Sequence, residues 1–277
     1  MKRIIVLISL LCALSAAAQK PASITVMSYN IRNGEAKDGT NSWQYRYPTS
    51  AMMVDDQSPD IMGVQEAYLY QVQYLDEYCK GYSSVGVGRE DGKKEGEHMS
   101  IFYNTKRIKL IKWGTFWLSD TPDKPTLGWD AACKRTATWA LMQDKASKQK
   151  FYVVNTHLDH VGVEARKKGL ELIASKIEEI NSGDLPIVVI GDFNMTPDAP
   201  ELSDFGKVMK SARATAFSSD RTTPTYNAWG KSENSSIIDH IYYKGFSSCT
   251  VFEVVTKPYA DRKFISDHYP VKATLIL

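Results

Sequence analysis

The sequence has few cysteines, no long apolar run and no large excess of one charge. Its 277 residues include four cysteines, none of them in a C-x-x-C pair, which excludes a disulfide framework and a paired-cysteine metal site. Cys79, Cys133 and Cys249 lie far apart in the chain, where either one disulfide bond or three free buried thiols fits. No G-x-S-x-G segment occurs, which argues against a serine hydrolase with a nucleophile elbow.

The N-terminal segment has the pattern of a secretory signal peptide. Two basic residues precede an apolar run over residues 4–14, and three alanines follow at positions 16–18. The run is shorter than the roughly 20 residues that a membrane-spanning helix needs, although a membrane anchor or an amphipathic first helix is the alternative. We expect residues 1–18 to be removed, and residues 19–277 to be exported to the periplasm or the medium without stable membrane insertion.

The balance of charge limits the partners of the mature chain. The expected signal peptide carries Lys2 and Arg3 and no acidic residue, so its removal lowers Lys+Arg from 34 to 32, against 32 Asp+Glu. A chain with no net charge lacks the basic excess of proteins that bind nucleic acid in bulk. It also has no basic amphipathic helix suited to a lipid surface. A small or non-polymeric ligand is therefore favoured over long DNA.

Residues 19–277 contain no repeat, low-complexity stretch or linker, which predicts a single domain. An apolar stripe with helical spacing predicts a helix over residues 164–180, and residues 50–57 and 68–79 are also expected to be helical. Strands outnumber these helices, which favours packed sheets covered by helices over a Rossmann sheet. The expected strands, rich in β-branched and aromatic residues, are 24–29, 60–64, 100–103, 138–141, 151–154, 187–190, 237–243, 250–255 and 271–277.

Two further segments are candidates for substrate specificity. Residues 86–97 are charged and glycine-rich, which is typical of a mobile surface loop. Residues 113–139 contain Trp117 and Trp129, whose rings either pack in the core or form a wall of a substrate cleft.

Polar side chains follow several of the expected strands at the point where each strand ends, the usual position of working groups on an α/β scaffold. Each of these segments alone also fits a turn or a helix cap. Four of the five histidines fall in or beside them, however, so one shared site is the better interpretation. The segments are 28–30, 64–66, 155–160, 191–194 and 266–268, together with Asp239 inside an apolar strand.

These segments offer mainly oxygen ligands. Asn30, Glu66, Asp192, Asn194 and Asp267 suit a hard divalent cation, Mg²⁺ first and Mn²⁺ as an alternative, and no thiolate cluster is available for zinc. Such an ion neutralises the oxygens of a phosphate ester, while a carboxylate directs the attacking water and an imidazole stabilises charge or moves a proton. The pattern therefore predicts metal-assisted hydrolysis of a phosphate ester.

The ordered set resembles the endonuclease/exonuclease/phosphatase superfamily, metal-dependent hydrolases related to pancreatic DNase and the abasic-site endonucleases. The most specific parts are residues 65–66, 191–194 and 266–268, which stand in the family's order, and the likeness runs from Ser23 to Leu277. The resemblance implies an α/β fold of the DNase I-like type, a four-layer α/β sandwich with two central, mostly antiparallel sheets.

The resemblance also implies roles for the oxygen ligands. Glu66 looks like the principal metal ligand, with Asn30 beside it and Asp267 as a further carboxylate ligand. Asp192 resembles the residue that positions or deprotonates the attacking water, assisted by Asn194.

Roles for the remaining residues follow in the same way. His268 resembles the imidazole held against the scissile phosphate, with Asp239 as its orienting partner. His157 matches a histidine of the DNase and phosphoesterase branches, where it contacts phosphate or acts as a general acid, and this counts against the abasic-site endonuclease branch. Arg135 is either a phosphate clamp through its bidentate fork or an exposed surface arginine.

Other residues near these segments are weaker candidates. Asp159 and His160 fit a turn and a helix cap nearly as well as a site, and His240 is expected outside the pocket because it points away from its neighbour on the strand. The sequence thus predicts an exported Mg²⁺-dependent phosphodiesterase, nuclease or phosphatase. Its alternative is a catalytically inactive binding protein on the same scaffold, disfavoured because the main catalytic positions are all retained.

Overall fold

The structure, a computed structural model, describes residues 22–277, so the expected signal peptide lies outside the described residues. The strands of the first sheet are β1 (Ser23–Asn30), β2 (Ile61–Gln65), β3 (Tyr82–Val85), β4 (Ile101–Asn104), β10 (Ser218–Ser219), β12 (Ser248–Val254) and β13 (Val271–Ile276). Those of the second are β5 (Ile108–Trp117), β6 (Thr136–Asp144), β7 (Lys150–His157), β8 (Ile187–Asp192), β9 (Lys210–Ser211) and β11 (Asp239–Lys244). The helices are α1 (Trp43–Gln57), α2 (Leu69–Tyr78), α3 (Val163–Ile180), α4 (Leu202–Val208) and α5 (Ala212–Thr215), with short 3₁₀ helices η1 (Gly39–Asn41), η2 (Ala228–Gly230) and η3 (Ser232–Asn234).

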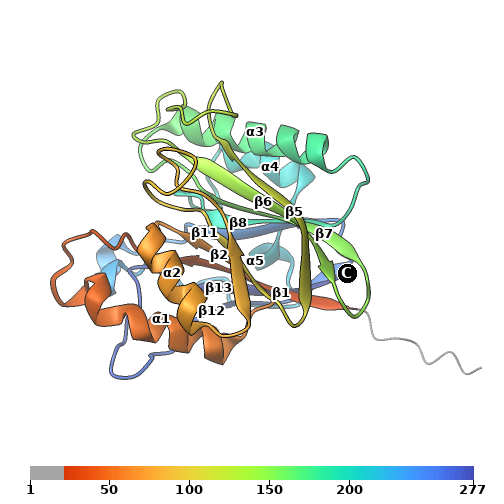
Figure 1. The fold of residues 1–277 in the computed structure, drawn as a ribbon. Coiled ribbons are helices and arrows are strands. Elements are labelled where there is room, and N and C mark those ends of the chain that lie inside the picture. The colour runs from red at the N-terminus through yellow and green to blue at the C-terminus, as the bar shows by residue number, and fades with distance from the viewer. Residues whose placement is uncertain (1–21) are drawn as a thin grey trace, which may run out of the picture.

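Two β-sheets pack face to face, and helices cover the outer face of each (Figure 1). The strand order is β10-β12-β13-β1-β2-β4-β3 in the first sheet and β5-β6-β7-β8-β11-β9 in the second. Most neighbours run antiparallel, whereas β1–β2, β7–β8 and β10–β12 are parallel. This is the four-layer α/β sandwich with two mostly antiparallel sheets that the family resemblance implies.

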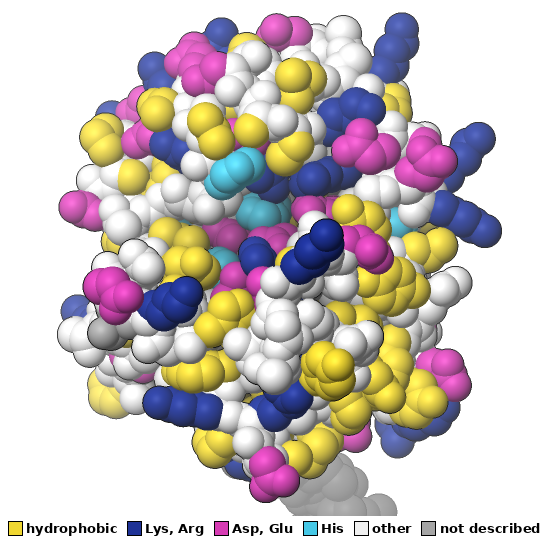
Figure 2. Space-filling model, turned by 90° about the vertical axis from the view of Figure 1, so that its left-hand side faces the viewer, with side chains coloured by type: hydrophobic (Ala, Val, Ile, Leu, Met, Phe, Trp, Pro, Cys, Tyr) yellow, Lys and Arg dark blue, Asp and Glu magenta, His cyan; other side chains and the backbone are white. Residues whose placement is uncertain are grey.

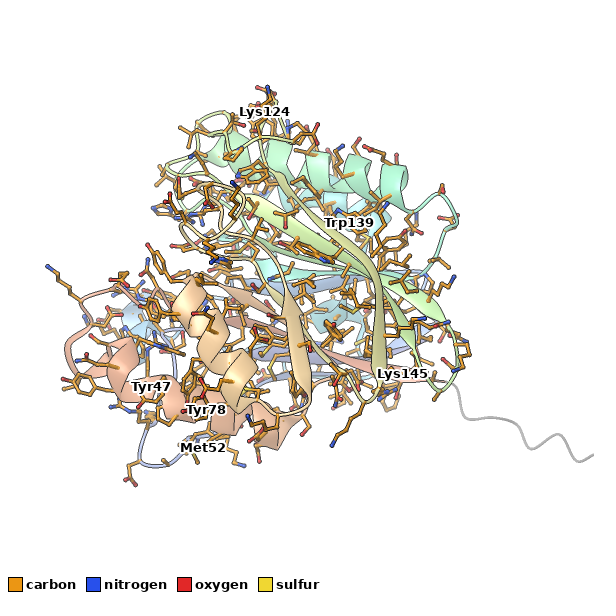
Figure 3. The ribbon with its side chains drawn as sticks, viewed as in Figure 1. Tyr47, Met52, Tyr78, Lys124, Trp139 and Lys145 are labelled. Atoms are coloured by element: carbon orange, nitrogen blue, oxygen red, sulfur yellow. The ribbon has the colours of Figure 1, made fainter. Side chains whose placement is uncertain are left out.

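The alternating faces of the strands build three apolar layers. In β8, Val188 and Ile190 point into the core between the two sheets, whereas Ile187 and Val189 point toward α3 and α4. A strand that is covered on both faces needs apolar residues at every position, which explains the continuous run from residue 187 to residue 190. The third layer packs α1 and α2 on the first sheet, and Tyr47, Met52 and Tyr78 lie exposed on the outer side of these helices (Figure 3).

The topology gathers the polar strand ends at one edge of the sandwich. Because β1 runs parallel to β2, Asn30 lies beside Gln65, and because β7 runs parallel to β8, His157 lies beside Asp192. The antiparallel strand β11 begins where β8 ends, which places Asp239 opposite Asp192. Five strands that are separate in the sequence thus bring their polar residues to the same edge.

Buried amides connect the two sheets just below this edge. The Asn155 Nδ2 of β7 donates to the carbonyl oxygens of Val64 and Ser100, at 2.8 and 3.0 Å. Its Oδ1 accepts a 2.7 Å hydrogen bond from Gln65 Nε2 of the first sheet. All of Asn155's polar atoms are therefore paired across the sheet interface, which fixes the relative position of the strands that carry the site.

Close packing explains the glycine that precedes Asp192. A Cβ atom at Gly191 would lie 2.0 Å from the carbonyl oxygen of Thr156 on the neighbouring strand β7. No side chain fits that distance, so glycine lets the ends of β7 and β8 approach closely and sets the spacing between His157 and Asp192.

Among the described residues, the cysteines are unpaired and no helix is suited to cross a membrane. Cys79, Cys133 and Cys249 are all free thiols there, without a disulfide bond among them. Across residues 22–277, no helix combines the length and the apolar composition that crossing a membrane requires.

Candidate active site

A cavity of about 710 Å³ opens at the edge where the polar strand ends meet. Figure 2 shows a hollow on this face in which histidine and acidic side chains are visible, with lysine and arginine side chains around it. Asn30 and Asp239 lie behind the lining, each bonded to a residue that does line the cavity. The other predicted site residues all line it: Glu66, Arg135, His157, Asp192, Asn194, Asp267 and His268.

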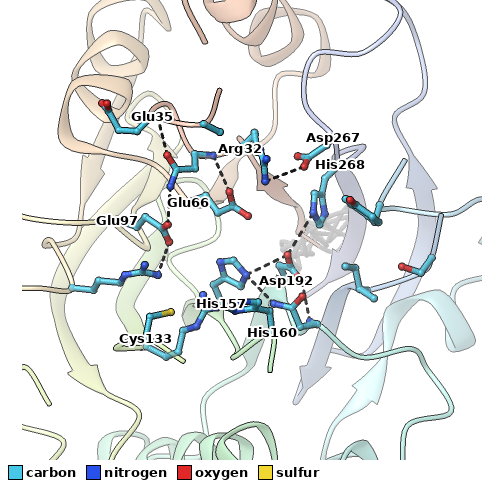
Figure 4. Close-up of a pocket in the computed structure, with 18 of the residues that line it drawn as sticks. Arg32, Glu35, Glu66, Glu97, Cys133, His157, His160, Asp192, Asp267 and His268 are labelled. Atoms are coloured by element: carbon cyan, nitrogen blue, oxygen red, sulfur yellow. Dashed lines mark hydrogen bonds and ion pairs between the residues drawn. The ribbon is translucent and has the colours of Figure 1, made fainter. Parts of the chain in front are cut away.

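Glu66 lies among the other cavity residues (Figure 4) and is held by two hydrogen bonds. Its Oε1 accepts from Asn30 Nδ2 at 2.9 Å, and its Oε2 accepts from the backbone N–H of Asn33 at 2.8 Å. Although burial opposes it, the hydrogen bond from Asn30 and the positive charge of His268 lower the pKa of Glu66. Glu66 also has a positive φ of 62°, a strained conformation for a residue with a side chain and one that clusters at functional sites.

Asn30 joins the two principal carboxylates. Its Nδ2 also donates to Asp192 Oδ2 at 3.0 Å, whereas its Oδ1 accepts from the backbone N–H of Arg32. The side chain therefore turns its donor group, and not its oxygen, toward Glu66 and Asp192. In this arrangement Asn30 orients both carboxylates, and the ligand role that the resemblance implies for Asn30 stays a prediction.

Asp192 lies between two histidines at the end of β8. Its Oδ1 accepts from the backbone N–H of Asn194 at 2.9 Å, and its Oδ2 lies 3.4 Å from His157 Nε2 and 3.7 Å from His268 Nε2. Burial raises the pKa of Asp192 to about 7, with a further contribution from Asp239 and with the His268 cation opposing it. A carboxylate with a pKa close to neutral pH is well matched to accept a proton.

His268 is bound to Asp239 as the sequence predicts. Its Nδ1 lies 2.8 Å from Asp239 Oδ2, and both side chains are buried. Burial alone would lower the pKa of His268, but the carboxylates of Asp239 and Asp192 raise it to about 10. His268 is therefore a fixed positive charge that faces the cavity at neutral pH.

His157, in contrast, is held neutral. Burial and the positive charges of Arg135 and Arg89 lower its pKa well below the usual range. The Asn194 Nδ2 donates to the carbonyl oxygen of Leu158 at 2.9 Å and to His157 Nε2 at 3.0 Å. The two site histidines therefore differ in charge: His268 is positive, whereas His157 is neutral.

Asp267 faces an arginine that the sequence reasoning missed. Arg32 Nη1 lies 3.3 Å from Asp267 Oδ2, and the same guanidinium forms two hydrogen bonds with Asp38, at 2.9 and 3.1 Å. Burial raises the pKa of Asp267, because this half-exposed arginine and His268 compensate it only in part. Arg32 stands two residues after Asn30 and has a φ of 63°, a local strain that sequence spacing does not reveal.

The donor set fits a hard divalent cation. Glu66 and Asp267 both line the cavity, and the negative charge of Glu66 acts on Asp267. Glu66, His157 and Asp192 also offer ligand atoms within 4.8 Å of one another, but Asn194 already bonds His157 Nε2 and one oxygen of Asp192. Carboxylates that are crowded and buried need a counter-ion, and oxygen-rich sites are those in which Mg²⁺ is bound in proteins.

Comparison with known proteins agrees with this geometry. The sequence profile of the Endonuclease/Exonuclease/phosphatase family matches residues 27–268. The chain belongs to this family. It is therefore a phosphoesterase of the endonuclease/exonuclease/phosphatase type, and its sandwich is the DNase I-like fold of its structural neighbours.

Several relatives cover nearly the whole chain. A family member from Bacteroides thetaiotaomicron is 35% identical, with a TM-score of 0.88 over 94% of this chain and 99% of that one. The mannosyl-6-phosphatase of the same species is 34% identical, with a TM-score of 0.87 over 92% of this chain and all of that one (100%). The uncharacterized protein L388 of Acanthamoeba polyphaga mimivirus is 26% identical over 83% of this chain and 90% of that protein.

Arg135 is a buried cavity residue of this phosphoesterase, not a surface arginine. Its side chain is 5% exposed, and its Nε lies 3.2 Å from Asp159 Oδ2. Asp159 Oδ1 in turn accepts the backbone N–H groups of Ala132, Val161 and Gly162. Asp159 therefore both closes the turn before α3, as the sequence suggests, and positions Arg135 in the cavity.

Further lining residues were missed because loops deliver them. Arg89 and Glu97 come from the charged segment 86–97, which the sequence marks as a candidate for specificity without naming the residues that point inward. Tyr226 packs against His268 with a ring separation of 5.0 Å, and only an isolated bridge to that residue places it there. Neither Trp117 nor Trp129 lines the cavity in the described part of the chain. Of the two roles expected for these rings, the structure shows packing and not a wall of the cleft.

His240 lies outside the cavity, as the alternation of β11 predicts. Its Nε2 donates to the carbonyl oxygen of Met195 at 2.8 Å, and its ring packs on Phe193. Burial lowers the pKa of His240 to about 4.

This buried histidine makes the stability of the phosphoesterase dependent on pH. The unfolded chain binds a proton near pH 6.5, about the ordinary pKa, whereas folded His240 stays neutral down to about pH 4. Its contribution is therefore complete above pH 6.5 and is lost as the pH falls, by about 3 kcal/mol at pH 4. We expect His240→Gln, which can still donate to Met195 but cannot titrate, to flatten this loss in urea unfolding curves between pH 7 and pH 4. An unchanged pH slope would contradict the assignment.

Proposed function

We propose that the chain is an exported, Mg²⁺-dependent phosphatase that hydrolyses a phosphate monoester of a small hydroxylated molecule. One observation carries the proposal: Glu66, Asp192, Asp267 and His268, which are distant in the sequence, converge on one cavity. The 34% identical mannosyl-6-phosphatase, which this chain matches over its whole length, supports a sugar phosphate as the substrate class.

The charge of each residue in the site determines its role in the reaction. A bound Mg²⁺ supplies charge neutralisation at the phosphoryl oxygens, and Glu66 and Asp267 would hold it, with Asn30 orienting Glu66. Asp192, with its raised pKa, accepts the proton of the water that attacks phosphorus as the ester P–O bond breaks. The leaving oxygen takes up a proton from water, so that the products are the free alcohol and phosphate. His268, kept positive by Asp239, faces the phosphoryl group.

Neighbouring groups complete phosphate binding. Neutral His157 contributes a hydrogen-bond contact, and Asn194 fixes its orientation through Nε2. Arg135, a buried substrate-binding residue next to it, is paired with Asp159, so it borders the phosphate site instead of acting as a free phosphate clamp. A neutral mature chain and a cavity of limited volume support a small ester over long nucleic acid.

Export is part of the same proposal. The basic start, the short apolar run and the alanines of residues 1–18 support removal of a signal peptide and action in the periplasm or the medium.

A panel of phosphate esters tests the proposal. We expect the purified protein to release phosphate from mannose 6-phosphate and from phenyl phosphate, to lose this activity in EDTA and to regain it with Mg²⁺. Bis(p-nitrophenyl) phosphate and DNA test the phosphodiesterase and nuclease alternatives. Activity that EDTA leaves intact would contradict the metal dependence, and faster cleavage of the diesters than of the monoesters would contradict the phosphatase assignment.

A further inference from the structure

We infer that one side of the cavity, the polar wall formed by Arg89, Glu97, Cys133, Arg135 and His160, is a binding site for an uncharged polyol, and that Glu97 selects this leaving group. The inference rests on the proposed phosphatase function and adds the chemistry of the group that leaves. In Figure 4, Glu97 and Cys133 lie across the cavity from Asp267 and His268. The polar wall therefore faces the part of a substrate beyond its phosphate.

The charges of the polar wall already balance. Each arginine or lysine in or next to it lies within ion-pair distance of a carboxylate. The pairs are Arg89 Nη1–Glu97 Oε2 at 2.6 Å, Arg89 Nε–Glu90 Oε1 at 3.6 Å, Lys134 Nζ–Glu90 Oε2 at 2.9 Å and Arg135 Nε–Asp159 Oδ2 at 3.2 Å. Three cations thus face three carboxylates. A second phosphate would need uncompensated positive charge, which these pairs do not leave, so the geometry favours an uncharged ligand.

Glu97 provides acceptors for hydroxyl groups. Its side chain is 6% exposed and lines the cavity. Oε2 accepts from Arg89, and Oε1 accepts a 3.3 Å hydrogen bond from Asn33 Nδ2. A carboxylate has about four acceptor positions, so two remain for hydroxyl groups after these bonds.

His160 provides a donor on the same wall. Arg135 Nη2 lies 3.0 Å from His160 Nδ1, and an arginine can only donate. His160 Nδ1 is therefore the acceptor, and the ring proton is on Nε2. Because a hydroxyl group both donates and accepts, a wall that offers Glu97 acceptors and a His160 donor is complementary to a polyol.

The polar wall has no surface on which a nucleobase could stack. Among the described residues that line the cavity, the only tyrosine, tryptophan or phenylalanine is Tyr226, whose ring packs on His268 at the other side. Proteins that bind unpaired bases stack them on such rings. A sugar or another polyol fits the wall better than a nucleoside does.

The loop that carries Glu97 is internally braced. The backbone N–H of Arg89 donates to the carbonyl oxygen of Glu97, and Trp117 Nε1 donates to the carbonyl oxygen of Arg89 at 2.7 Å. Asp91 Oδ1 accepts three backbone N–H groups of the same loop, those of residues 93–95. The wall is thus positioned before a ligand binds, which lowers the entropic cost of binding.

A comparison of two esters of similar size distinguishes recognition of the polyol from hydrolysis of the phosphate ester. Mannose 6-phosphate and cyclohexylmethyl phosphate share a six-membered ring and a primary phosphate, but only the first has hydroxyl groups. We expect the wild-type protein to prefer mannose 6-phosphate in kcat/KM by about 10²-fold, because buried polar groups left unpaired penalise the analogue. Glu97→Gln should lower this ratio by about 10-fold or more, whereas Glu95→Gln, an exposed glutamate of the same loop, should leave it unchanged.

A second pair of variants covers the case in which Glu97→Gln does not fold. His160 is exposed, so we expect His160→Ala to fold and to lower the ratio, and His160→Gln, which restores an N–H donor, to recover it in part. A fall of the ratio in either test supports the inference.

Other outcomes would overturn the inference, and they distinguish a failure of the polyol site from a failure of the phosphatase function. A wild-type ratio near one, or an equal loss on both esters in Glu97→Gln, would overturn the polyol site and leave the phosphatase function standing. A preference for mannose 1,6-bisphosphate over the monophosphate would show a second anion site in its place. Failure to hydrolyse either ester at any Mg²⁺ concentration would remove the proposed function and the inference together.

Discussion

Asp192→Asn should lower kcat by about 10²-fold or more, the scale of losing a general base. The amide cannot accept the proton of the attacking water. It would also turn an N–H group toward a donor, because the two oxygens of Asp192 accept from Asn30 Nδ2 and from the backbone of Asn194. Steady-state kinetics with saturating Mg²⁺ and phenyl phosphate measure the loss without involving the polyol site.

Folding is expected to survive this substitution. Burial raises the pKa of Asp192, which means that the ionised carboxylate is destabilised in the folded protein and that a neutral side chain costs little there. Asp198→Asn, at an exposed aspartate a short distance along the chain, is the matched control and should retain full activity. If Asp192→Asn kept wild-type turnover while its circular dichroism and Tm were unchanged, Asp192 would not be the base.

The polar ends of the strands were predictable because topology and chemistry coincide there. Asp192 and His157 follow apolar strands, so the sequence itself marks the edge at which they lie. The pairing of Asp239 with His268 depends on a carboxylate inside an apolar strand, which needs a buried partner. Such residues carry a local signal, and the structure brings them together.

The other residues of the cavity have no comparable local pattern in the sequence. Arg89 and Glu97 lie in a loop in which most residues are charged, and only the folded structure shows that these two side chains line the cavity and pair with each other. Arg32 is fixed by a left-handed backbone conformation and by contact with Asp267, 235 positions later in the chain. Contacts between loops depend on the folded topology, not on local spacing.

Several elements were not predicted, among them β3, β9, β10, α4 and α5. For two others the error has an identifiable reason. The strand β5 was not predicted, because a bulge between Leu110 and Lys112 interrupts the alternation of its faces. The helix α1 begins at Trp43, seven residues before the predicted start, since Pro48 lies inside it and breaks the helical pattern. Neither error affected the predicted site, because neither element supplies a residue that lines the cavity.

Glu66→Gln should raise the Mg²⁺ concentration for half-maximal activity by about 10- to 100-fold, the range seen when a metal site loses a supporting group. Both oxygens of Glu66 are fixed by donors, Asn30 Nδ2 and the Asn33 backbone. The amide of glutamine removes the negative charge and places an N–H group against one of these donors. The side chain at position 66 should therefore bind the cation more weakly, because it has lost its negative charge and is no longer held by both donors.

Thermal unfolding provides a readout that does not depend on turnover. A ligand that binds only the folded state raises Tm, and at a given concentration it raises Tm more the more tightly it binds. Mg²⁺ should therefore raise the Tm of the wild-type protein and of Glu77→Gln, which changes an exposed glutamate on α2. The same Mg²⁺ concentration should shift Glu66→Gln much less. If Glu66→Gln showed the wild-type metal titration and the wild-type Tm shift, the cation would have to be held by the remaining carboxylates, and Asp192 could not then be reserved for the water.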